Sequence, residues 1–578
     1  MSGIYGILNK KGSSTDVPHF RYFFSSLYPN ILNEEFTYKS FTYGRSVHRK
    51  LLNDRVMHED KELIIAFEGI IYNKTCNNNA EHLKTQYKKH GINFVETIDG
   101  LFSGFIYDKI ANVIYVFSDH LNTRPVYYYS DKDCFMFSSE LKHISGYLRG
   151  NQKSLTPDYD GIYSMLGFGF LMDDLTYIKE VRNLLYGSFL KFDVRLFNFT
   201  INNYFAFEKK IDKKLTRAEI IDKINNLMIN NVKKHWNKDK EYNYRHYSAL
   251  SGGMDAKTQL LLAAELGFSD ITTITFGESG SSDHNISLDV AKRNNFEHIY
   301  LTLDNGTYLT KNIDEYIKAT DGLMPFFSFS HAYNSMKKIN HNNYGILHSG
   351  QIGDVVFGSF INPKFNIDIN IYNMSYHGIM PPQIYKTINC LPEIMNRYRN
   401  NNYELFSYEQ RQINGTLYGD RAIYNITDTS SIYYDRKLIE FSLSLPDSIK
   451  LNEKLLINWL KEKHPTILQY KWSKCGTKPS SMFKINTGKL LKGINSRTRR
   501  LLKLNYDSMN PFDLWFMNNP AILKNLDNLF QQNIEVISNN ALQKDFELVY
   551  SYRGDRFMRN KFTVITMLLA LKMHIGVV

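Results

Sequence analysis

Cysteine is scarce in this chain, with only four among 578 residues. The four are scattered, and no two of them have the CxxC spacing of a metal or redox pair; they are Cys76, Cys134, Cys390 and Cys475. This pattern argues against a disulfide framework and against a zinc site. It fits a reducing compartment, and we therefore expect a cytoplasmic protein.

Long hydrophobic runs are missing as well. The longest apolar run near the C-terminal end covers residues 562–571, about half the length that a membrane-spanning helix needs. Near the N-terminal end, residues 4–8 are too few for the core of a signal peptide, and polar residues follow at once. We expect no signal peptide and no membrane span.

The chain also has no excess of acidic residues. Its formal net charge is +12, with 70 Lys and Arg against 58 Asp and Glu. A basic surface favours acidic or phosphorylated partners, but a Lys- and Asn-rich proteome gives the same balance, and we predict no nucleic-acid partner. The basic run at 489–503 is typical of a solvated helix face, and a surface for a protein or peptide partner is the alternative.

The chain is organised around a short glycine loop at residues 251–255, Ser-Gly-Gly-Met-Asp. A strand-like run, 244–250, precedes the loop, and a helix-forming run, 258–266, follows it. A strand, a glycine turn and a helix together present backbone N–H groups and a partial positive charge to a phosphate. Asp255 would be repelled by phosphate alone, so we expect it to hold a Mg²⁺ that bridges to the phosphate. On the loop alone, an ordinary strand-to-helix turn is an equal alternative.

This loop resembles the pyrophosphate-binding loop of the ATP pyrophosphatases, and the preceding Leu250 fits the asparagine synthetase branch of that family. The family pattern continues with Ser after the Asp, where this chain has Ala256. The resemblance implies ATP and Mg²⁺ as cofactors, with ATP in a crevice formed by this loop and the segment after the next strand. The ATP-binding residues that it implies are Leu250, Ser251, Gly252, Gly253, Met254, Asp255, Phe276 and Gly350.

A second motif, residues 349–358, resembles the family's Ser-Gly-Glu-Gly-Ser-Asp-Glu-Val-Phe-Gly segment. Asp354 keeps the acid of that pattern and is implied as a second Mg²⁺ ligand beside Asp255, because two carboxylates on one metal suit a leaving pyrophosphate. The Glu of the pattern is Gln351 here, which forms hydrogen bonds but cannot accept a proton. Position 351 is therefore not predicted to be a general base.

Strand-like and helix-like runs alternate beyond the glycine loop, at 271–277, 283–294 and 298–301. This alternation predicts an α/β domain with a doubly wound parallel sheet, whose ligands bind at the carboxyl ends of the strands. We assign residues 208–578 to this ATP-binding, synthetase-like domain and expect its C-terminal part to be helical.

The first 207 residues resemble a class II glutamine amidotransferase domain, which implies an α+β αββα sandwich of the N-terminal-nucleophile hydrolase type. In that family the N-terminal nucleophile is Cys, and here the position holds Ser2. Glu68, next to Gly69, stands where the family has an Asn that helps to form the oxyanion hole, and a carboxylate there would repel an oxyanion. We interpret Ser2, Glu68 and Gly69 as a degenerate glutaminase site, although an N-terminal Ser serves as nucleophile in other hydrolases.

Three further residues are candidates for catalysis by resemblance. Asp428 stands where the family has a Glu and is a candidate for orienting a base. The family's phosphate-contacting lysine does not align, and Lys454 or Lys474 would take its place. Either lysine is equally well explained as a solvated surface residue.

The resemblance implies an AMP-forming carbon–nitrogen ligase: ATP adenylates a substrate carboxylate, pyrophosphate leaves on Mg²⁺, and an amine attacks the acyl-adenylate. Family members without the N-terminal Cys include β-lactam synthetases and lasso peptide cyclases, which use an amine already in the substrate. We therefore expect a small-molecule or peptide carboxylate as substrate, with a peptide macrolactam as the leading product. A partner protein from the same biosynthetic pathway is possible, and the sequence leaves the oligomeric state open.

Three alternatives remain on the sequence alone. The first is a glutamine-dependent amidating enzyme that uses Ser2, and the second is an enzyme that uses free ammonia. The third is a non-catalytic scaffold or binding protein, which Ala256, Gln351 and the misplaced lysine favour.

Overall fold

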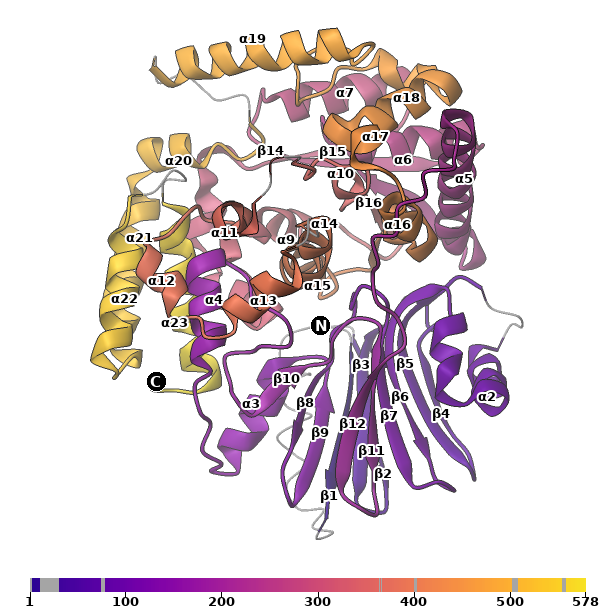
Figure 1. Cartoon of the computed structure of the whole chain (residues 1–578), viewed down its shortest axis with the longest axis vertical. Helices are drawn as coiled ribbons and strands as arrows, with labels where there is room; N and C mark the ends of the chain where they lie inside the picture. The colour runs from indigo at the N-terminus through magenta and orange to yellow at the C-terminus, as the bar shows by residue number, and fades with distance from the viewer. Residues whose placement is uncertain are drawn as a thin grey trace.

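The computed structural model describes most of the chain, and two layered regions stand out in it (Figure 1). The described residues are 3–10, 31–73, 78–362, 364, 366–399, 403–501, 508–553 and 558–578. Ser2 and Cys76 lie outside them, whereas the other three cysteines are described and free. Within these ranges no helix is long and apolar enough to cross a membrane.

The N-terminal region is a sandwich of two antiparallel sheets. The described strands of the first sheet run in the order β10-β8-β9-β1-β3-β2 and those of the second in the order β12-β11-β7-β6-β5-β4. Helix α2 (Asn79–His90) packs beside the second sheet and α3 (Leu141–Gly150) beside the first. The first sheet comprises β1 (Gly3–Asn9), β2 (Ile31–Tyr38), β3 (Phe41–His48), β8 (Tyr127–Ser130), β9 (Cys134–Ser138) and β10 (Val181–Asn183). The second comprises β4 (Val56–Glu59), β5 (Leu63–Ile71), β6 (Gly100–Asp108), β7 (Val113–Ser118), β11 (Ser188–Asp193) and β12 (Asn198–Asn203).

Aromatic side chains fill the space between these two sheets. Phe41 and Phe137 from the first sheet are fully buried against Phe105 and Phe192 from the second. Alternate residues of each strand point inward, so a strand that faces this core must be apolar at every second position. The predicted αββα sandwich is confirmed. Residues 204–216 carry no helix or strand, and the boundary predicted between 207 and 208 lies in that stretch.

The second region is built on a parallel sheet in the order β15-β14-β13-β16-β17. Its strands are β13 (Arg245–Ala249), β14 (Ile271–Gly277), β15 (Glu297–Thr302), β16 (Tyr344–Ser349) and β17 (Thr429–Ser431). The chain moves outward from β13 to β15 and then returns to the other side of β13, which creates a topological switch between β13 and β16. Ligands of open α/β sheets bind at such a switch, beyond the carboxyl ends of the strands. The predicted doubly wound parallel sheet is confirmed.

Helices cover this sheet and form most of the C-terminal part, as predicted. The long helix α5 begins with a complete capping box, in which Thr216 and Glu219 satisfy each other's backbone N–H groups. The helices beyond α3 are α4 (Tyr159–Phe168), α5 (Arg217–Glu241), α6 (Met254–Glu265), α7 (Ser282–Asn294), α8 (Ile313–Thr320), α9 (Ser330–Met336), α10 (Gly353–Val356), α11 (Ile367–Asn370), α12 (Pro382–Lys386), α13 (Leu391–Arg397), α14 (Tyr403–Phe406), α15 (Leu417–Ile423), α16 (Arg436–Leu443), α17 (Asp447–Lys450), α18 (Lys454–Lys463), α19 (Met482–Leu501), α20 (Phe512–Asn518), α21 (Pro520–Asn533), α22 (Asn540–Ser551) and α23 (Arg559–His574).

The two regions share their hydrophobic core. Tyr127 and Met136 from the first sheet belong to the same buried cluster as Phe326 and Leu568 from the second region. Helix α23 crosses this cluster and contacts both α3 and α4 (Figure 1). The two regions are therefore joined at their seam by a shared buried cluster.

Candidate active site

The glycine loop connects β13 to α6 at the carboxyl edge of the parallel sheet. Gly253 caps the helix, and the backbone N–H of Gly252 donates to the carboxylate of Asp283 over 2.8 Å. The hydroxyl of Ser251 accepts from the N–H of Gly253 at 3.2 Å. The N-terminus of α6 lies at this edge, and its partial positive charge suits an anion.

The second glycine motif follows β16 and lies directly against the first loop. A Cβ atom on Gly350 would lie 2.6 Å from the backbone nitrogen of Ala256, and one on Gly353 would lie 2.8 Å from the side chain of Asp255. Only glycine allows the two backbones to come this close. The two motifs are far apart in the sequence, and the structure joins them into one site.

Carboxylates converge where the two loops meet. Burial raises the pKa of Asp255 well above its usual value, the negative charges of Asp354 and Glu453 raise it further, and Lys474 opposes the shift. Asp354 accepts from its own helix at the Val355 N–H over 2.9 Å. Clustered carboxylate oxygens are the donors that Mg²⁺ prefers, and a divalent cation would relieve their repulsion. Asp255 and Asp354 thus fit the metal role that the sequence predicts for them.

A cavity of about 300 Å³ opens beside these loops. Six residues predicted to bind ATP line it, whereas Gly252 faces Ser473 and Met254 is buried in the core. The lining residues are Ala249, Leu250, Ser251, Gly253, Asp255, Ala256, Ile274, Phe276, His331, Ala332, Met336, Leu347, Ser349, Gly350, Gln351, Asp420, Ile423, Thr429 and Met509. We call it the loop cavity.

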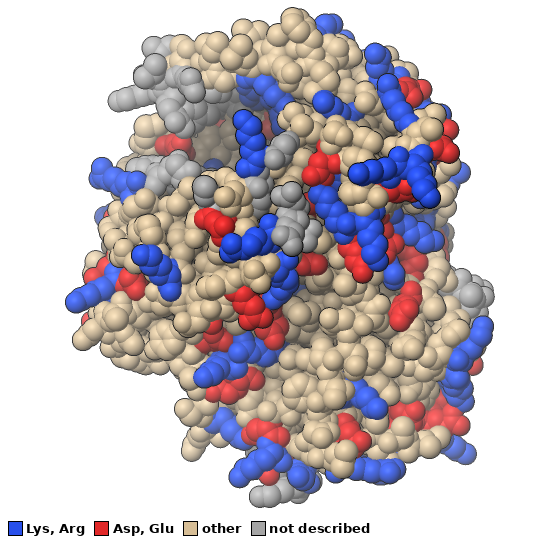
Figure 2. All heavy atoms as spheres, in the orientation of Figure 1, with Lys and Arg blue, Asp and Glu red and all other residues tan. Residues whose placement is uncertain are grey.

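A second cavity of about 400 Å³ adjoins the loop cavity. The two share five lining residues, namely His331, Ala332, Gln351, Asp420 and Ile423. The remaining walls of this second cavity are largely apolar and aromatic, with two arginines among them: Met324, Phe327, Ser328, Phe329, Tyr376, Arg411, Thr416, Gly419, Phe512 and Arg559. Figure 2 shows a hollow on this face of the molecule between α19 and α20.

Two ionisable groups lie at the junction of the two cavities. Burial raises the pKa of Asp420 to about 6, although hydrogen bonds from Tyr434 and Gln351 and the charge of Arg124 oppose the shift. Burial lowers the pKa of His331 to about 4, so its ring is neutral at neutral pH. Among the described residues, Nδ1 of His331 has no hydrogen-bond partner.

Of the two predicted lysines, Lys474 lies close to the loops. Its Nζ pairs with Glu453 at 2.9 Å, and the neighbouring Ser473 N–H donates to the carbonyl of Gly252 over 2.9 Å. Lys454 is exposed at the start of α18. Lysines 489 and 492 of the basic run face the same 472–474 turn, because Nζ of Lys492 donates to the carbonyl of Ser473. The side chains of the run's arginines lie outside the described residues.

Asp428 lies away from the two cavities, in a buried cluster at the seam. Its carboxylate pairs with Arg55 at 2.6 Å and Arg124 at 3.0 Å, both from the N-terminal region. Burial alone would raise the pKa of Asp428, but the two arginines hold it well below its usual range. A carboxylate that is paired with two buried arginines is not placed to orient a base. Asp428 therefore does not lie where the sequence analysis expected it.

Arg55 also pairs with Glu68, one of the residues of the predicted degenerate glutaminase site. Both carboxylate oxygens of Glu68 accept from Nε of Arg55 at 3.1 Å, and Glu68 is fully buried. Gly69 has a φ of +145°, and a Cβ there would lie 2.0 Å from the carbonyl oxygen of Leu101. Where the sequence predicts a degenerate oxyanion hole, the structure thus has a buried ion pair next to a glycine with a positive φ. Ser2 lies outside the described residues.

A buried trio of possible metal ligands lies elsewhere, between α5, β13 and β16. Asp239 Oδ2 accepts from His246 Nδ1 and from His348 Nε2, each at 2.8 Å. The other oxygen of Asp239 accepts from the N–H of Ile346 at 2.8 Å. These hydrogen bonds satisfy both oxygens of the Asp239 carboxylate without a metal. They also link α5 to β13 and β16.

Two family models match the chain. The model described as glutamine amidotransferase domain matches residues 52–205, and the one described as asparagine synthase matches residues 223–411. Together they cover more than half of the chain, in the order in which the structure places the sandwich and the parallel sheet. The chain belongs to the asparagine synthetase family.

Relatives in this family are distant. The chain is 26% identical over 352 residues to a putative glutamine-hydrolysing asparagine synthetase 2 of Methanocaldococcus jannaschii, which covers 57% of this chain and 65% of that protein. It is 23% identical over 270 residues to the glutamine-hydrolysing asparagine synthetase 1 of Bacillus subtilis, covering 44% of this chain and 41% of that protein. The chain thus spans less than two thirds of the length of either relative.

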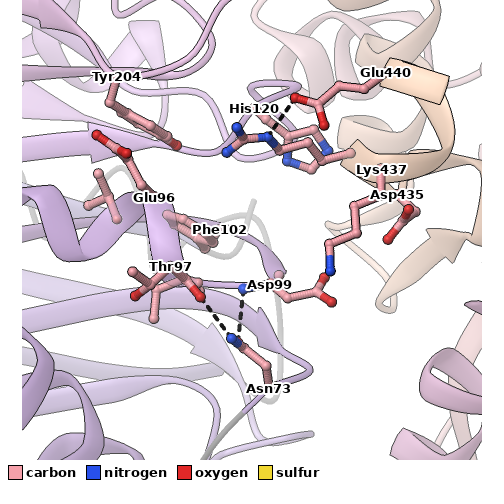
Figure 3. A pocket seen from close by; sticks show the side chains of 14 residues that line it. Asn73, Glu96, Thr97, Asp99, Phe102, His120, Tyr204, Asp435, Lys437 and Glu440 are labelled. Atoms are coloured by element: carbon pink, nitrogen blue, oxygen red, sulfur yellow. Dashed lines mark hydrogen bonds and ion pairs between the residues drawn. The ribbon is translucent and has the colours of Figure 1, made fainter. Parts of the chain in front are cut away.

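A third cavity, of about 430 Å³, lies at the seam and shares no lining residue with the other two. Figure 3 shows that Asn73, Asp99 and His120 from the sandwich face Asp435 and Lys437 at the start of α16. The carboxylates of Asp99 and Asp435 are already paired, because both accept from Nζ of Lys234, at 2.8 and 2.6 Å respectively. None of the site residues predicted from the sequence lines this cavity.

Sequence reasoning missed Asp420 and His331. Neither lies in a motif of the asparagine synthetase family that the sequence analysis used. Both reach the site from helices, α15 and α9, that are placed by tertiary packing. The sequence offered one hint. Gln351 stands where the family motif has Glu, so another residue would have to supply the missing carboxylate.

Proposed function

We propose that this protein is an ATP-dependent, AMP-forming carbon–nitrogen ligase that adenylates a substrate carboxylate and joins it to an amine. The observation that carries the proposal is the contact between the two glycine loops, which brings Asp255, with the charge of Asp354 beside it, to a cavity that continues into a second one. One cavity suits a nucleotide and the other suits the molecule to be activated. A ligase of this type needs both at one junction.

The residues present divide the chemistry between them. The N-terminus of α6 and the 251–253 loop bind the phosphates, and Lys474 offsets charge beside them. A carboxylate oxygen of the substrate attacks the α-phosphorus, and the bond to the bridging oxygen breaks as pyrophosphate leaves. Mg²⁺ held by Asp255 and Asp354 would neutralise charge on the leaving pyrophosphate. The amine nitrogen then attacks the acyl carbon, loses a proton, and displaces AMP.

The second cavity supports a substrate with apolar groups. Its walls include Phe327, Phe329 and Phe512, and their aromatic faces suit apolar side chains better than those of a small polar amino acid. Arg411 lies over the rings of Phe360 and Tyr376 at 4.8 and 4.7 Å and offers a charged group at the rim. A peptide or other extended carboxylate fits these features.

The source of the amine follows from the N-terminal region. Glutamine hydrolysis needs a nucleophile and an oxyanion hole, and the Glu68–Arg55 ion pair occupies the second of these. An amine that is already part of the substrate needs neither. We therefore propose intramolecular amide formation, with a peptide macrolactam or a lactam as the product. The cytoplasmic location and the pathway partner stay predictions.

Exchange of labelled pyrophosphate into ATP tests the proposal, because it requires a reversible adenylation. Pools of hydrophobic peptides and of free amino acids are added in turn, with and without glutamine. We expect exchange with the peptide pool and no effect of glutamine. Asp255→Ala should remove the exchange, whereas Asp289→Ala, which changes an exposed carboxylate on α7, should not.

Exchange that appears only with free aspartate, together with glutamate release from glutamine, would favour a glutamine-dependent amidating enzyme instead. Amide formation that needs added ammonium would favour the ammonia-dependent alternative. No exchange with any pool would favour a binding or scaffold role.

A further inference from the structure

Asp420 is a buried carboxylate on α15 that lines both the loop cavity and the second cavity. Among the described residues shared by these two cavities, it is the one carboxylate. The meeting point of the cavities is where an activated carboxyl group and an attacking amine would come together. A group that acts on both must therefore lie at this junction.

The neighbours of Asp420 give it a fixed position. The hydroxyl of Tyr434 donates to its Oδ2, and the side-chain amide of Gln351 donates to the same carboxylate. Gln351 is in turn fixed, because its backbone carbonyl accepts from the hydroxyl of Ser431 at 2.9 Å. Position 351 holds Gln where the family motif has Glu. The side chain of Gln351 is thus hydrogen-bonded to a carboxylate that comes from elsewhere in the chain, that of Asp420 on α15.

We infer that Asp420 accepts the proton that the attacking amine must lose, an inference that rests on the proposed ligase function. As the amine nitrogen bonds to the acyl carbon, its extra proton passes to a carboxylate oxygen of Asp420. The carbon–oxygen bond to AMP then breaks, and AMP leaves with that electron pair. Gln351 and Tyr434 hold the carboxylate in place and are positioning residues.

The ionisation of Asp420 suits this step. With a pKa of about 6 the carboxylate is ionised at neutral pH and is a stronger base than an ordinary Asp, which matches the range in which general bases work best. The charged and titratable groups around it are Tyr434, Tyr424, Arg124, His331 and Arg411. His331 has its pKa lowered to about 4, so it does not titrate in the same range.

The test separates adenylation from amide formation in Asp420→Asn. The probe is a pool of hydrophobic dipeptides with free amino and carboxyl ends, which supply both reacting groups. Exchange of labelled pyrophosphate into ATP should stay within a few-fold of wild type, because adenylation needs no base on the amine. The rate of amide product, measured by mass spectrometry, should fall by on the order of 10²- to 10⁴-fold.

Hydroxylamine provides a rescue that a merely structural role would not show. It is largely unprotonated at neutral pH and attacks acyl-adenylates without help from a base. Asp420→Asn should therefore form the hydroxamate at close to the wild-type rate while it fails to form the dipeptide-derived amide. The acid limb of the wild-type amide rate, near pH 6, should disappear in the variant, and Asp420→Glu should recover part of the rate.

Glu409→Gln is a matched control. Glu409 is also a carboxylate whose pKa burial raises, and it accepts from the hydroxyls of Tyr186 and Tyr398. It lines a different cavity and neither of the two cavities that meet at Asp420. This variant should keep both exchange and amide formation.

The possible outcomes separate the role of Asp420 from the ligase function. Normal amide formation by Asp420→Asn, with normal exchange, would overturn the role of Asp420 and leave the ligase proposal standing. Equal loss of exchange, amide and hydroxamate in a folded variant would also overturn it, since the residue would then act in adenylation or binding. Absence of exchange in the wild type would overturn the ligase proposal and this inference with it.

Discussion

Arg55 joins the two regions at their seam through buried ion pairs. It donates to both oxygens of Glu68 and to the carboxylate of Asp428, and all three side chains are almost completely buried. A buried carboxylate without its partner carries a large desolvation cost. We therefore expect the pair of Glu68 with Arg55 to contribute to stability.

Arg55→Met tests this at the residue scale. We expect the free energy of unfolding to fall by about 3–5 kcal/mol, because the change leaves the buried carboxylate of Glu68 without its arginine and leaves Asp428 paired with Arg124 alone. Thermal unfolding measures the effect as a fall of several degrees in the midpoint. Adding Glu68→Gln to Arg55→Met should recover part of the loss.

Arg293→Met is the control for that prediction. Arg293 is well exposed and pairs with Asp289 on the surface of α7 at 3.5 Å. Exposed pairs of this kind contribute at most about 1 kcal/mol, so its midpoint should hardly move. A small effect of Arg55→Met, equal to that of the control, would contradict the structural role of the cluster.

At the scale of elements, the decisive feature is the close contact between the turn after β16 and the start of α6. Gly350 and Gly353 allow it, because a Cβ on either would meet atoms of residues 255–256 at less than 3 Å. The contact fixes Asp255 relative to Asp354, and a metal site needs that fixed separation.

Gly350→Ala should therefore damage adenylation more than stability. A Cβ that must lie 2.6 Å from the Ala256 nitrogen pushes α6 away from the second loop. A displacement of about 1 Å at a site of this kind costs on the order of 10²-fold in rate. Pyrophosphate exchange measures the loss, with thermal unfolding as the check that the variant is folded.

The matched glycine is Gly493 in α19, where a new Cβ would meet no heavy atom within 4 Å. Alanine favours a helix interior over glycine by about 1 kcal/mol, so Gly493→Ala should keep the exchange rate and lose no stability. Equal exchange rates in the two alanine variants would show that the close contact is not required.

Much of this element-scale picture could be predicted from the sequence. The 251–255 loop and the 349–358 motif carry local signals, since glycines next to strand-like and helix-like runs fix a turn and its position in a parallel sheet. Asp420 and His331 could not be predicted, because their place depends on how α15 and α9 pack. Asp428 shows another limit: the motif suggested a residue that orients a base, but the arginines that pair with its carboxylate come from the other region and carry no signal in that motif.

At the scale of the whole molecule, one interior runs through both regions. The buried cluster that holds Tyr127 of the sandwich also holds Phe326 and Leu568 of the synthetase region. A second cluster joins Leu101 and Leu121 to Ile432. Shared cores of this kind make separate unfolding of the two regions costly.

We therefore expect the chain to unfold in a single calorimetric transition. All four tryptophans lie beyond residue 207, so tryptophan fluorescence reports on the second region alone, whereas heat capacity reports on the entire chain. The two melting curves should coincide. A separate calorimetric transition without a change in fluorescence would show that the sandwich unfolds independently.

The central claim is that the junction of the two glycine loops activates a carboxylate with ATP and without glutamine. The most direct measurement is the exchange of labelled pyrophosphate into ATP by the wild type and by Asp255→Ala, with hydrophobic peptides and no glutamine. The account predicts exchange that depends on the peptides and that falls to background in the variant. Exchange that survives in Asp255→Ala, or no exchange by the wild type with any carboxylate pool, would contradict it.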